Sequence, residues 1–427
     1  MKVAIVALGS RGDTQPCVAL GRGLAGRGHE VVVVAASRYA ELVARAKIGP
    51  GDVPVDGRSG GPVGGAAGRI EHAPVSVDPV AIVESEEGRA WLRSGPLGFV
   101  RGFRTVVEPL AEKLVAEVDA ACRDADLVLA PALGALGRHL SDRYGMPYAI
   151  MHFQPSEPTT EFPNPLIPAR TLGRLGNRAS YALVERLSWL LLGGMANRLR
   201  AGVLGLGPLR GSPFALDRRD RVPVLCGVSP LVVPRPRDWP GHVHLTGAWR
   251  LAGGGLPKHV EDFCRAGPPP LFAGFGSMSV TEELAEQVVG ALRLAGMRAV
   301  LQGLPAAPGE DLLLVDEVPH DRLFPLVAAV VHHGGAGTTA TALAAGVPSV
   351  VCPFFSDQPF WGRRVEALGA GPRPLPVSRV TARALAARIR QAVLHCQEKS
   401  AQLGRQLGVE DGVNNAVDLI EATRSSG

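Results

Sequence analysis

Lysine is scarce in this sequence of 427 residues, and the spread of its basic residues narrows the classes of partner. Lysine occurs five times, so arginine dominates the 45 basic residues, which stand against 40 acidic ones for a net charge of +5. No run of basic residues has the density of a nucleic-acid-binding surface, and we expect no nucleic acid partner. This charge is compatible with a solvated arginine-rich surface, or with a mildly basic face toward anionic donors or lipid headgroups.

Closely spaced cysteines and long apolar runs are missing as well. The six cysteines are scattered without a C-x-x-C pair, which argues against a disulfide scaffold or a zinc site and fits a reducing compartment. No apolar run reaches the about 18 residues of a membrane-spanning helix. The first residues, MKVAIVALG, predict a strand and not a signal peptide. We therefore expect a cytoplasmic protein with at most peripheral membrane contact.

The chain is long enough for two domains of roughly 200 residues each. Its 46% of hydrophobic residues suffices for two cores. We predict a first domain at 1–232, a linker at 233–245, a second domain at 246–403 and a terminal helical segment at 404–427. Nothing in the sequence indicates an oligomeric state.

The amino-terminal part has the pattern of a strand, a loop, a helix and a second strand. Apolar residues at 2–8 predict the first strand, the loop is 9–13, helical spacing follows at 14–27, and 31–35 predicts the next strand. This order begins a parallel doubly wound sheet, an α/β fold. The loop lacks the G-x-G-x-x-G spacing of dinucleotide-binding proteins. Residues 49–68 hold eight glycines and three prolines and predict a mobile loop or an insertion.

A long helical pattern occupies the later part of the first domain. It runs from about 170 to 203 and is expected to break near Gly193. The apolar run 188–192 within it fits either a core or the wall of a small-molecule pocket. Residues 222–227 predict the last strand of this domain, and four prolines between 230 and 240 predict a stiff linker.

Residues 315–362 form the most informative stretch of the chain. Apolar runs predict strands at 327–331 and 347–351, with a helix that begins at Thr339 between them. Glycines before the helix let the backbone approach a ligand, and the helix start offers unpaired N–H groups and the positive end of its dipole. The residues predicted to bind an anion there are His333, Gly335, Ala336, Gly337 and Thr338.

Asp357 and Gln358 follow the second of these strands. Because ligands of open α/β sheets bind at the carboxyl ends of the strands, this pair is placed to bind vicinal sugar hydroxyls. An anion site at one end and a polyol site at the other describe the two parts of a nucleotide sugar.

The segments PHDRLFP, AVVHHGGAGTT and PFFSDQPFWG resemble the donor-binding box of family 1 glycosyltransferases. They are most similar to the sterol 3-β-glucosyltransferase branch and its bacterial relatives that act on antibiotics. The resemblance implies two facing Rossmann-like doubly wound parallel-sheet domains (GT-B) with a cleft between them. It also implies inverting transfer of a hexose from a UDP- or TDP-sugar to a hydroxyl of a lipophilic acceptor. In relatives the carboxyl-terminal tail crosses back onto the first domain.

The loop GSRGD after the first strand contains the candidate catalytic base, Asp13. Its carboxylate could take the proton of an acceptor hydroxyl, or it could merely cap the following helix. The loop resembles that of glycopeptide and sterol glycosyltransferases, where the aspartate is the proposed base. Ser10 and Arg11 could approach the donor, although Arg11 is equally explained as a surface charge.

The resemblance implies further donor contacts in the second domain. His333 corresponds to the phosphate-contacting histidine and Ser277 to a donor-contacting serine, for which a turn or helix-cap role is the alternative. The backbone at Val318 is expected to contact the base, and the side chain of His320 the ribose. Glu317 stands where plant relatives carry a base-stacking tryptophan, so the choice between uridine and thymidine stays open.

The adjacent histidines His332 and His333 follow a strand, so their side chains tend to opposite sides, which disfavours joint metal ligation. We expect His332 to be packed inside. Because preorganised donors can replace a divalent metal at a diphosphate, we predict neither metal nor cofactor. His152 is a second candidate base or acceptor contact, with a buried structural histidine as the alternative.

Two other functions remain compatible with these motifs. A sugar-nucleotide epimerase can share the two-domain plan, and a non-catalytic sugar-nucleotide-binding partner protein can keep the donor site. The apolar, proline-rich region 157–205 speaks against the epimerase, since it suits an acceptor pocket. Sterol, macrolide, aromatic polyketide and lipid acceptors all fit an apolar cleft.

Overall fold

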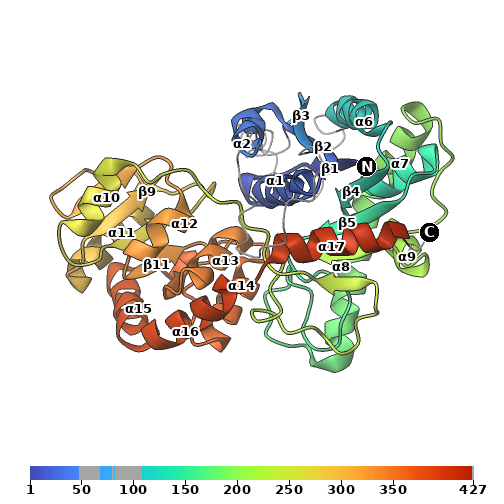
Figure 1. Ribbon diagram of the computed structural model, residues 1–427. Helices are drawn as coiled ribbons and strands as arrows, with labels where there is room; N and C mark the ends of the chain where they lie inside the picture. The colour runs from blue at the N-terminus through green and yellow to red at the C-terminus, as the bar shows by residue number, and fades with distance from the viewer. Residues whose placement is uncertain (48–67, 79–80, 82–107, 426–427) are drawn as a thin grey trace.

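The structure, a computed structural model, describes residues 1–47, 68–78, 81 and 108–425. These residues form two α/β domains that lie side by side (Figure 1). Most of the segment predicted as a mobile loop or an insertion, 49–67, lies outside the described residues.

The first domain is built on a parallel sheet of seven strands. The pairs β2–β1 and β1–β4 show that the strand order reverses beside β1. In spatial order the strands are β3 (Arg69–Val75), β2 (Glu30–Ala36), β1 (Lys2–Ala7), β4 (Leu127–Pro131), β5 (Tyr148–His152), β6 (Val224–Cys226) and β7 (Val243–Leu245).

The second domain repeats the same order in a parallel sheet of five strands. Here the strand order reverses between β8 and β11. In spatial order the strands are β10 (Leu312–Val315), β9 (Ala299–Gln302), β8 (Leu271–Gly274), β11 (Ala329–His332) and β12 (Ser349–Val351). The predicted fold class, two doubly wound parallel-sheet domains, is confirmed.

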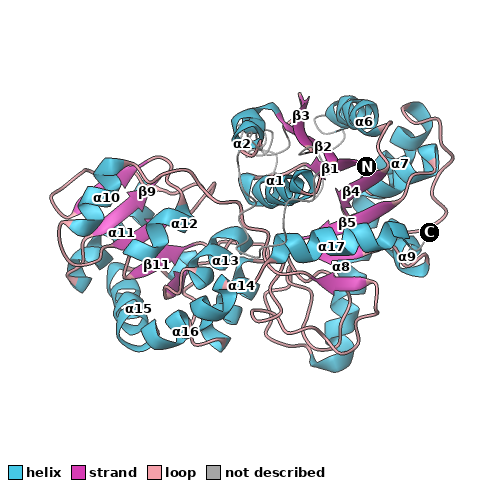
Figure 2. Ribbon diagram, viewed as in Figure 1, coloured by secondary structure: helices cyan, strands magenta, loops and turns pink. Residues whose placement is uncertain are grey.

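Helices cover both faces of each sheet (Figure 2). Those of the first domain are α1 (Arg11–Gly26), α2 (Ala40–Arg45), α6 (Glu108–Cys122), α7 (Leu136–Tyr144), α8 (Gly173–Gly202) and α9 (Pro213–Arg219). Those that follow are α10 (Lys258–Arg265), α11 (Glu282–Ala295), α12 (His320–Leu323), α13 (Ala336–Ala344), α14 (Gln358–Ala367), α15 (Ala382–His395), α16 (Gln397–Gly408) and α17 (Gly412–Ser425).

The apolar strands of both sheets are buried on their two faces. Along β1, Val3 and Ile5 pack into one hydrophobic cluster while Ala4 and Val6 pack into another on the opposite face. Side chains alternate across a strand, so a sheet with helices on both faces needs an apolar residue at every position. This is why each of these strands appears in the sequence as a continuous run of apolar residues.

Three predictions about elements are wrong. The helical region does not break near Gly193: α8 is continuous, and this buried glycine leaves room for the ring of Trp189. Residues 222–227 do not hold the last strand of the first sheet, because β7 follows and pairs with β6. Strand β7 therefore lies within 233–245, the segment predicted as the linker. It has three residues, too few for a periodicity to be recognised.

The proline-containing segment after β6 is packed against the second domain. Val228, Val232 and Val233 are buried with residues of α13, α14 and α16, including Trp361. The side chain of Arg364 donates two hydrogen bonds to the carbonyl of Val232, at 2.8 and 2.6 Å. This segment thus contributes a hydrophobic contact between the domains.

The carboxyl-terminal helix α17 lies against the first domain (Figure 1). Val417 and Ile420 are buried in the same cluster as β1 and α1. Arg27 bonds Asp418 at 2.7 Å, and His29 Nε2 lies 2.9 Å from Glu421. The helix α17 thus packs on the first domain, and His29 takes part in that contact. Among the described helices, none has the length and hydropathy needed to cross a bilayer.

Candidate functional site

The anion-binding candidate lies where β11 passes into α13. The buried His332 accepts a hydrogen bond from the backbone N–H of Gly334 at its Nδ1, at 3.1 Å. Gly334 has a φ of 94°, and a Cβ there would lie 2.7 Å from Val351, so this turn needs glycine. Helix α13 then begins at Ala336, three residues earlier than predicted, with Gly335 at its N-cap. Gly337 and Thr338 therefore lie in its first turn.

His333 lies beside this helix start. A Cβ on Gly335 would lie 2.5 Å from its Nε2, and one on Gly276 would lie 2.9 Å from its Cε1. Its Nδ1 is buried and has no hydrogen-bond partner among the described residues. Burial lowers the pKa of His333 to about 4, so the ring is neutral at pH 7 and carries one N–H.

The loop after β8 reaches the same place. Gly276 adopts a φ of 60° and brings the backbone against the ring of His333. Ser277 follows it and is exposed. The cap of α11 is Thr281, which accepts from the N–H of Leu284, so Ser277 does not cap that helix.

The residues expected near the base and ribose are partly engaged within the second domain. Val318 is buried. His320 Nε2 lies 2.7 Å from the amide oxygen of Gln302, and its ring stacks on Phe324 at 4.7 Å. Burial, with the nearby positive charge of Arg11, lowers the pKa of His320 to about 4.

Asp357 and Gln358 open α14. Gln358 is buried, and its oxygen accepts from the N–H groups of Phe354 and Phe355 at 2.7 and 3.3 Å, which holds the preceding loop closed. Asp357 Oδ2 accepts from Trp361 Nε1 at 2.8 Å. Burial raises the pKa of Asp357, and the negative charge of Asp13, from the first domain, raises it further.

Asp13 lies at the third position of α1, because the helix begins at Arg11 and not at Thr14. Its Oδ2 accepts from both the backbone N–H and the hydroxyl of Ser10, each at 2.9 Å. Asp13 is therefore not the N-cap of a helix that begins at Thr14; Ser10 is the N-cap, and Asp13 reaches back to it as the second member of a capping box. Burial raises the pKa of Asp13, and the two hydrogen bonds from Ser10 partly oppose that effect.

A pocket of about 450 Å³ opens beside Asp13, within the first domain. Its wall is formed by the carboxyl ends of β1, β4 and β5 together with α8 and α9. Apolar side chains form much of it: Val6, Leu8, Leu133, Leu136, Ile150, Met151, Phe153, Leu166, Val184, Phe214, Val222 and Val224. Its size and lining suit a small apolar molecule.

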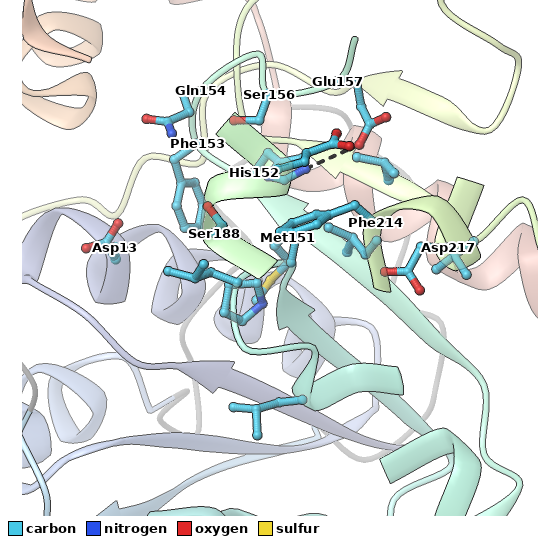
Figure 3. A pocket seen from close by; sticks show the side chains of 18 of the residues that line it. Asp13, Met151, His152, Phe153, Gln154, Ser156, Glu157, Ser188, Phe214 and Asp217 are labelled. Atoms are coloured by element: carbon cyan, nitrogen blue, oxygen red, sulfur yellow. Dashed lines mark ion pairs between the residues drawn. The ribbon is translucent and has the colours of Figure 1, made fainter. Parts of the chain in front are cut away.

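Polar side chains gather at the far part of this pocket, where His152 faces Glu157 at 3.6 Å (Figure 3). Burial by itself would raise the pKa of Glu157, but the net shift is downward. The hydrogen bond with His152 is the largest of the effects that lower this pKa. Ser188 also lines the pocket, so one end of the apolar run 188–192 contributes to its wall. The sequence did not indicate Glu157, Glu185, Asp217, Arg218 or His242, which reach the pocket from distant segments.

The two sheets bring these residues together at their switch points. Residues 10–13 follow β1, Ser277 follows β8 and His333 follows β11, and α1 contacts α13. In open α/β sheets ligands bind outside the carboxyl ends of the strands at such points. One predicted residue lies apart: His152 belongs to the pocket, away from the anion-binding candidate.

The part of the chain that the structure describes contains no cluster of three His, Cys, Asp or Glu side chains fit to hold a metal. One Asp-x-Asp triplet, Asp124 to Asp126, directly precedes β4. It therefore lies at the amino end of that strand, whereas the candidate site lies at the carboxyl ends of the strands. Asp126 accepts from the backbone N–H of Lys2 at 2.8 Å, so it holds the start of β1. Metal independence stays a prediction.

Residues 283–406 match the family described as the C-terminal domain of erythromycin biosynthesis protein CIII-like proteins. Over 439 residues the chain is 35% identical to the O-mycaminosyltylonolide 6-deoxyallosyltransferase of Streptomyces fradiae, covering 99% of this chain and 97% of that enzyme. The chain belongs to the family 1 glycosyltransferases.

This glycosyltransferase is also 32% identical to a sterol 3-beta-glucosyltransferase of Arabidopsis thaliana, over 98% of its own length and 64% of that enzyme. Its fold matches that of the glycosyltransferase VinC, solved in complex with DTDP, with a TM-score of 0.65 and 19% identity over both whole chains. The glycosyltransferase therefore has the GT-B fold.

Proposed function

We propose that this chain is an inverting, nucleotide-sugar-dependent hexosyltransferase that acts on a hydroxyl of a lipophilic acceptor. In this proposal Asp13 takes the proton of the acceptor hydroxyl. The acceptor oxygen forms a bond to the anomeric carbon as the bond from that carbon to the diphosphate breaks. The nucleoside diphosphate leaves with the electron pair, and in-line displacement converts an α-linked donor into a β-glycoside.

The observation that carries the proposal is the location of Asp13 between an apolar pocket and the second domain. Asp13 lines the pocket, and its charge acts on Asp357 across the domain boundary. The Ser10 contacts occupy Oδ2 alone, which leaves Oδ1 for an acceptor hydroxyl. A raised pKa makes this carboxylate a stronger base than an ordinary aspartate.

The donor diphosphate is assigned to the start of α13. The first-turn N–H groups at Ala336, Gly337 and Thr338, together with the dipole of the helix, favour an anion there. His333 adds a neutral N–H donor from a buried ring whose Nδ1 has no partner among the residues that the structure describes. Because these donors are held in place before the reaction, they can stabilise the leaving diphosphate without a metal.

The sugar is assigned to Asp357 and the nucleobase end to Val318 and His320. Gln358, predicted to share the sugar contact, already uses its amide oxygen for the loop at Phe354. We therefore assign the hydroxyl-accepting role to Asp357. The acceptor is assigned to the apolar pocket, and its class follows the relatives, one named for a macrolide-type substrate and one for sterols.

A thermal-shift panel of UDP, TDP, GDP, ADP and NAD, with and without EDTA, tests the donor site. A ligand at about 100 times its dissociation constant adds roughly 2.7 kcal/mol of stability, a shift that is readily measured. We expect a shift with UDP or TDP that EDTA does not change. A shift that needs a divalent metal contradicts metal independence, and no response to any nucleotide contradicts the donor site.

Product analysis with the nucleotide sugar that binds distinguishes the proposed transferase from an epimerase and from a non-catalytic binding protein. An epimerase converts the donor without an acceptor, and a non-catalytic binding protein converts nothing in any acceptor screen. The proposed transferase releases nucleoside diphosphate only when an acceptor hydroxyl is present.

A further inference from the structure

The pocket beside Asp13 contains more charge than the binding of a purely apolar molecule requires. Besides Asp13, the described residues that line it include three carboxylates and one arginine: Glu157, Glu185, Asp217 and Arg218. Removing charged groups from water is costly unless each of them has a partner. The partner of each carboxylate therefore shows whether the pocket is complete without a ligand.

Two of these carboxylates are neutralised by arginine. Glu185 accepts two hydrogen bonds from Arg218, at 2.6 and 2.7 Å. Asp217 accepts from Arg138 Nε at 2.6 Å and from the hydroxyl of Tyr148 at 2.7 Å. Each of these two carboxylates thus has an arginine at hydrogen-bond distance, and neither needs a ligand to offset its charge.

Glu157 has no such partner among the residues that the structure describes. It is 8% exposed, and the structure pairs its carboxylate with one side chain, that of His152, whose Nε2 lies 3.6 Å from Oε1. Arg218 and His242 act on Glu157 from a longer distance. At contact distance, this charge can therefore be offset only by a proton on His152 or by a cation that a ligand brings.

The backbone holds Glu157 and His152 in this arrangement. The carbonyl of Glu157 accepts from Nε1 of the buried Trp239, at 3.1 Å. The carbonyl of His152, the last residue of β5, accepts from the backbone N–H of Gly227, at 2.8 Å. Figure 3 shows the two side chains turned toward each other, with Asp13 at a separate part of the pocket. A ligand that fills the pocket can therefore contact Asp13 and Glu157 with two different groups.

We propose that the carboxylate of Glu157, beside His152, binds a protonated amine of the acceptor. The acceptor is then a lipophilic molecule that carries both a hydroxyl and a separate ammonium group. This inference rests on the proposed function: the hydroxyl meets Asp13, the apolar body fills the pocket, and the ammonium N–H groups donate to Glu157. Charge-assisted hydrogen bonds are stronger than neutral ones, so this contact selects which hydroxyl reaches Asp13.

The charge of the pocket decides between an amine and other polar groups. An anionic group would be repelled by the carboxylates, and Arg218 is already bonded to Glu185. A neutral hydroxyl could donate one hydrogen bond to Glu157, but it would not offset the negative charge. An ammonium group supplies the hydrogen-bond donors together with the positive charge.

Isothermal titration calorimetry with two matched probes tests the proposal. The probes are 1-adamantylmethylamine, which is protonated at pH 7, and the alcohol 1-adamantanemethanol. We expect the amine to bind at least about tenfold more tightly than the alcohol. The isosteric variant Glu157→Gln should lose that preference and bind the alcohol as before. The variant His152→Gln breaks the same ion pair but keeps the carboxylate, so the preference should persist.

The matched control is Glu161→Gln, the same chemical change at an exposed residue outside the pocket lining. Glu161 accepts a hydrogen bond from the backbone N–H of Arg237, which a glutamine oxygen can also accept. This variant should bind both probes like the unaltered protein, and melting curves should show that all variants fold. Equal affinity of the unaltered protein for the two probes, or a preference that Glu157→Gln retains, overturns the proposal.

These outcomes are distinguishable from those of the nucleotide panel. Equal binding of the two probes removes the amine site and leaves the transferase proposal intact. If neither probe binds while UDP or TDP does, the amine site and the acceptor pocket are both wrong, and the donor site stands. A preference for the amine that depends on Glu157, without any response to nucleotides, supports the amine site and contradicts the donor site.

Discussion

Arg11, in the first turn of α1, forms an ion pair with Glu317, which precedes α12 in the other domain. The pair joins the domains two residues from Asp13. Both side chains are more than half exposed, so the pair by itself contributes little stability, about 0.2–1 kcal/mol. The pair matters because it engages the guanidinium of Arg11, the group that was predicted to approach the donor.

We predict opposite effects of the two partners on donor binding. Glu317→Gln releases Arg11 and removes a negative charge at the nucleobase end of the proposed donor site, so affinity for the UDP- or TDP-sugar should increase a few-fold. Arg11→Gln should decrease it. Both effects should shrink at high salt because the groups are exposed. Isothermal titration calorimetry measures both, and weaker binding by each variant would show that the intact pair serves the donor site.

Asp13→Asn should lower the turnover rate by about 10²–10⁴-fold, the usual contribution of a positioned general base. The amide oxygen can still accept from Ser10, so the fold should persist. Ser10→Ala is the matched stability control: it removes one contact and should cost about 0.5–2 kcal/mol as a lost cap. Steady-state kinetics and melting curves check both variants. Transfer by Asp13→Asn at the unaltered rate would exclude Asp13 as the base.

The transfer rate should fall on the acid side at a pH above that of an ordinary aspartate. Burial raises the pKa of Asp13, and only its ionised form can accept a proton. The pH dependence of folding stability has the opposite direction: lowering the pH slows transfer but removes a destabilising effect of Asp13. The folded state binds this proton more tightly than the unfolded state, so the destabilising contribution of ionised Asp13 disappears as pH falls through its raised folded pKa. A pH profile of kcat/KM, compared with that of Asp13→Asn, measures the acid limb.

Donor binding should be coupled to proton uptake by His333. Its pKa of about 4 in the free protein rises when a diphosphate approaches, so affinity for UDP-glucose should increase as pH falls toward the liganded pKa. The fully esterified diphosphate does not itself titrate in this range. Calorimetry in buffers of different ionisation enthalpy counts the protons taken up. The His333→Gln variant should show none, and equal uptake by both proteins would assign the proton elsewhere.

The packing of α17 on the first domain should contribute measurably to stability. Ile420 is 4% exposed in the cluster that includes β1 and α1, so Ile420→Ala should cost about 2–5 kcal/mol. Val409, 85% exposed just before α17, provides the control: Val409→Ala should change stability by less than about 0.5 kcal/mol. Denaturant unfolding measures both. If the two variants are equally stable, the tail does not support the first domain.

Local patterns were sufficient for most elements of the site. The apolar runs predicted β1 and β11, and the segment after each one holds candidate residues. Local patterns did not, however, predict the residue at which the helices begin. Gly337 disfavours a helix by propensity, yet α13 begins at Ala336, after Gly335 as its N-cap, and its buried Ala342 and Leu343 pack against neighbouring elements.

Glycine was also misread in α8, where Gly193 predicted a break. In a helix packed closely against its neighbours a glycine can serve packing, and here it faces the ring of Trp189. The tertiary contacts that keep α8 continuous outweigh the cost of about 1 kcal/mol for a helical glycine.

The sequence by itself determined the class of fold, the family and the segment that we predict to bind an anion, because these depend on residues that are neighbours in the chain. Only the tertiary structure decided what meets across the domains. It set Arg11 against Glu317, and it gathered Glu157, Arg218 and His242 around one pocket. Such contacts depend on how two sheets and their connecting helices pack, and no local periodicity records that packing.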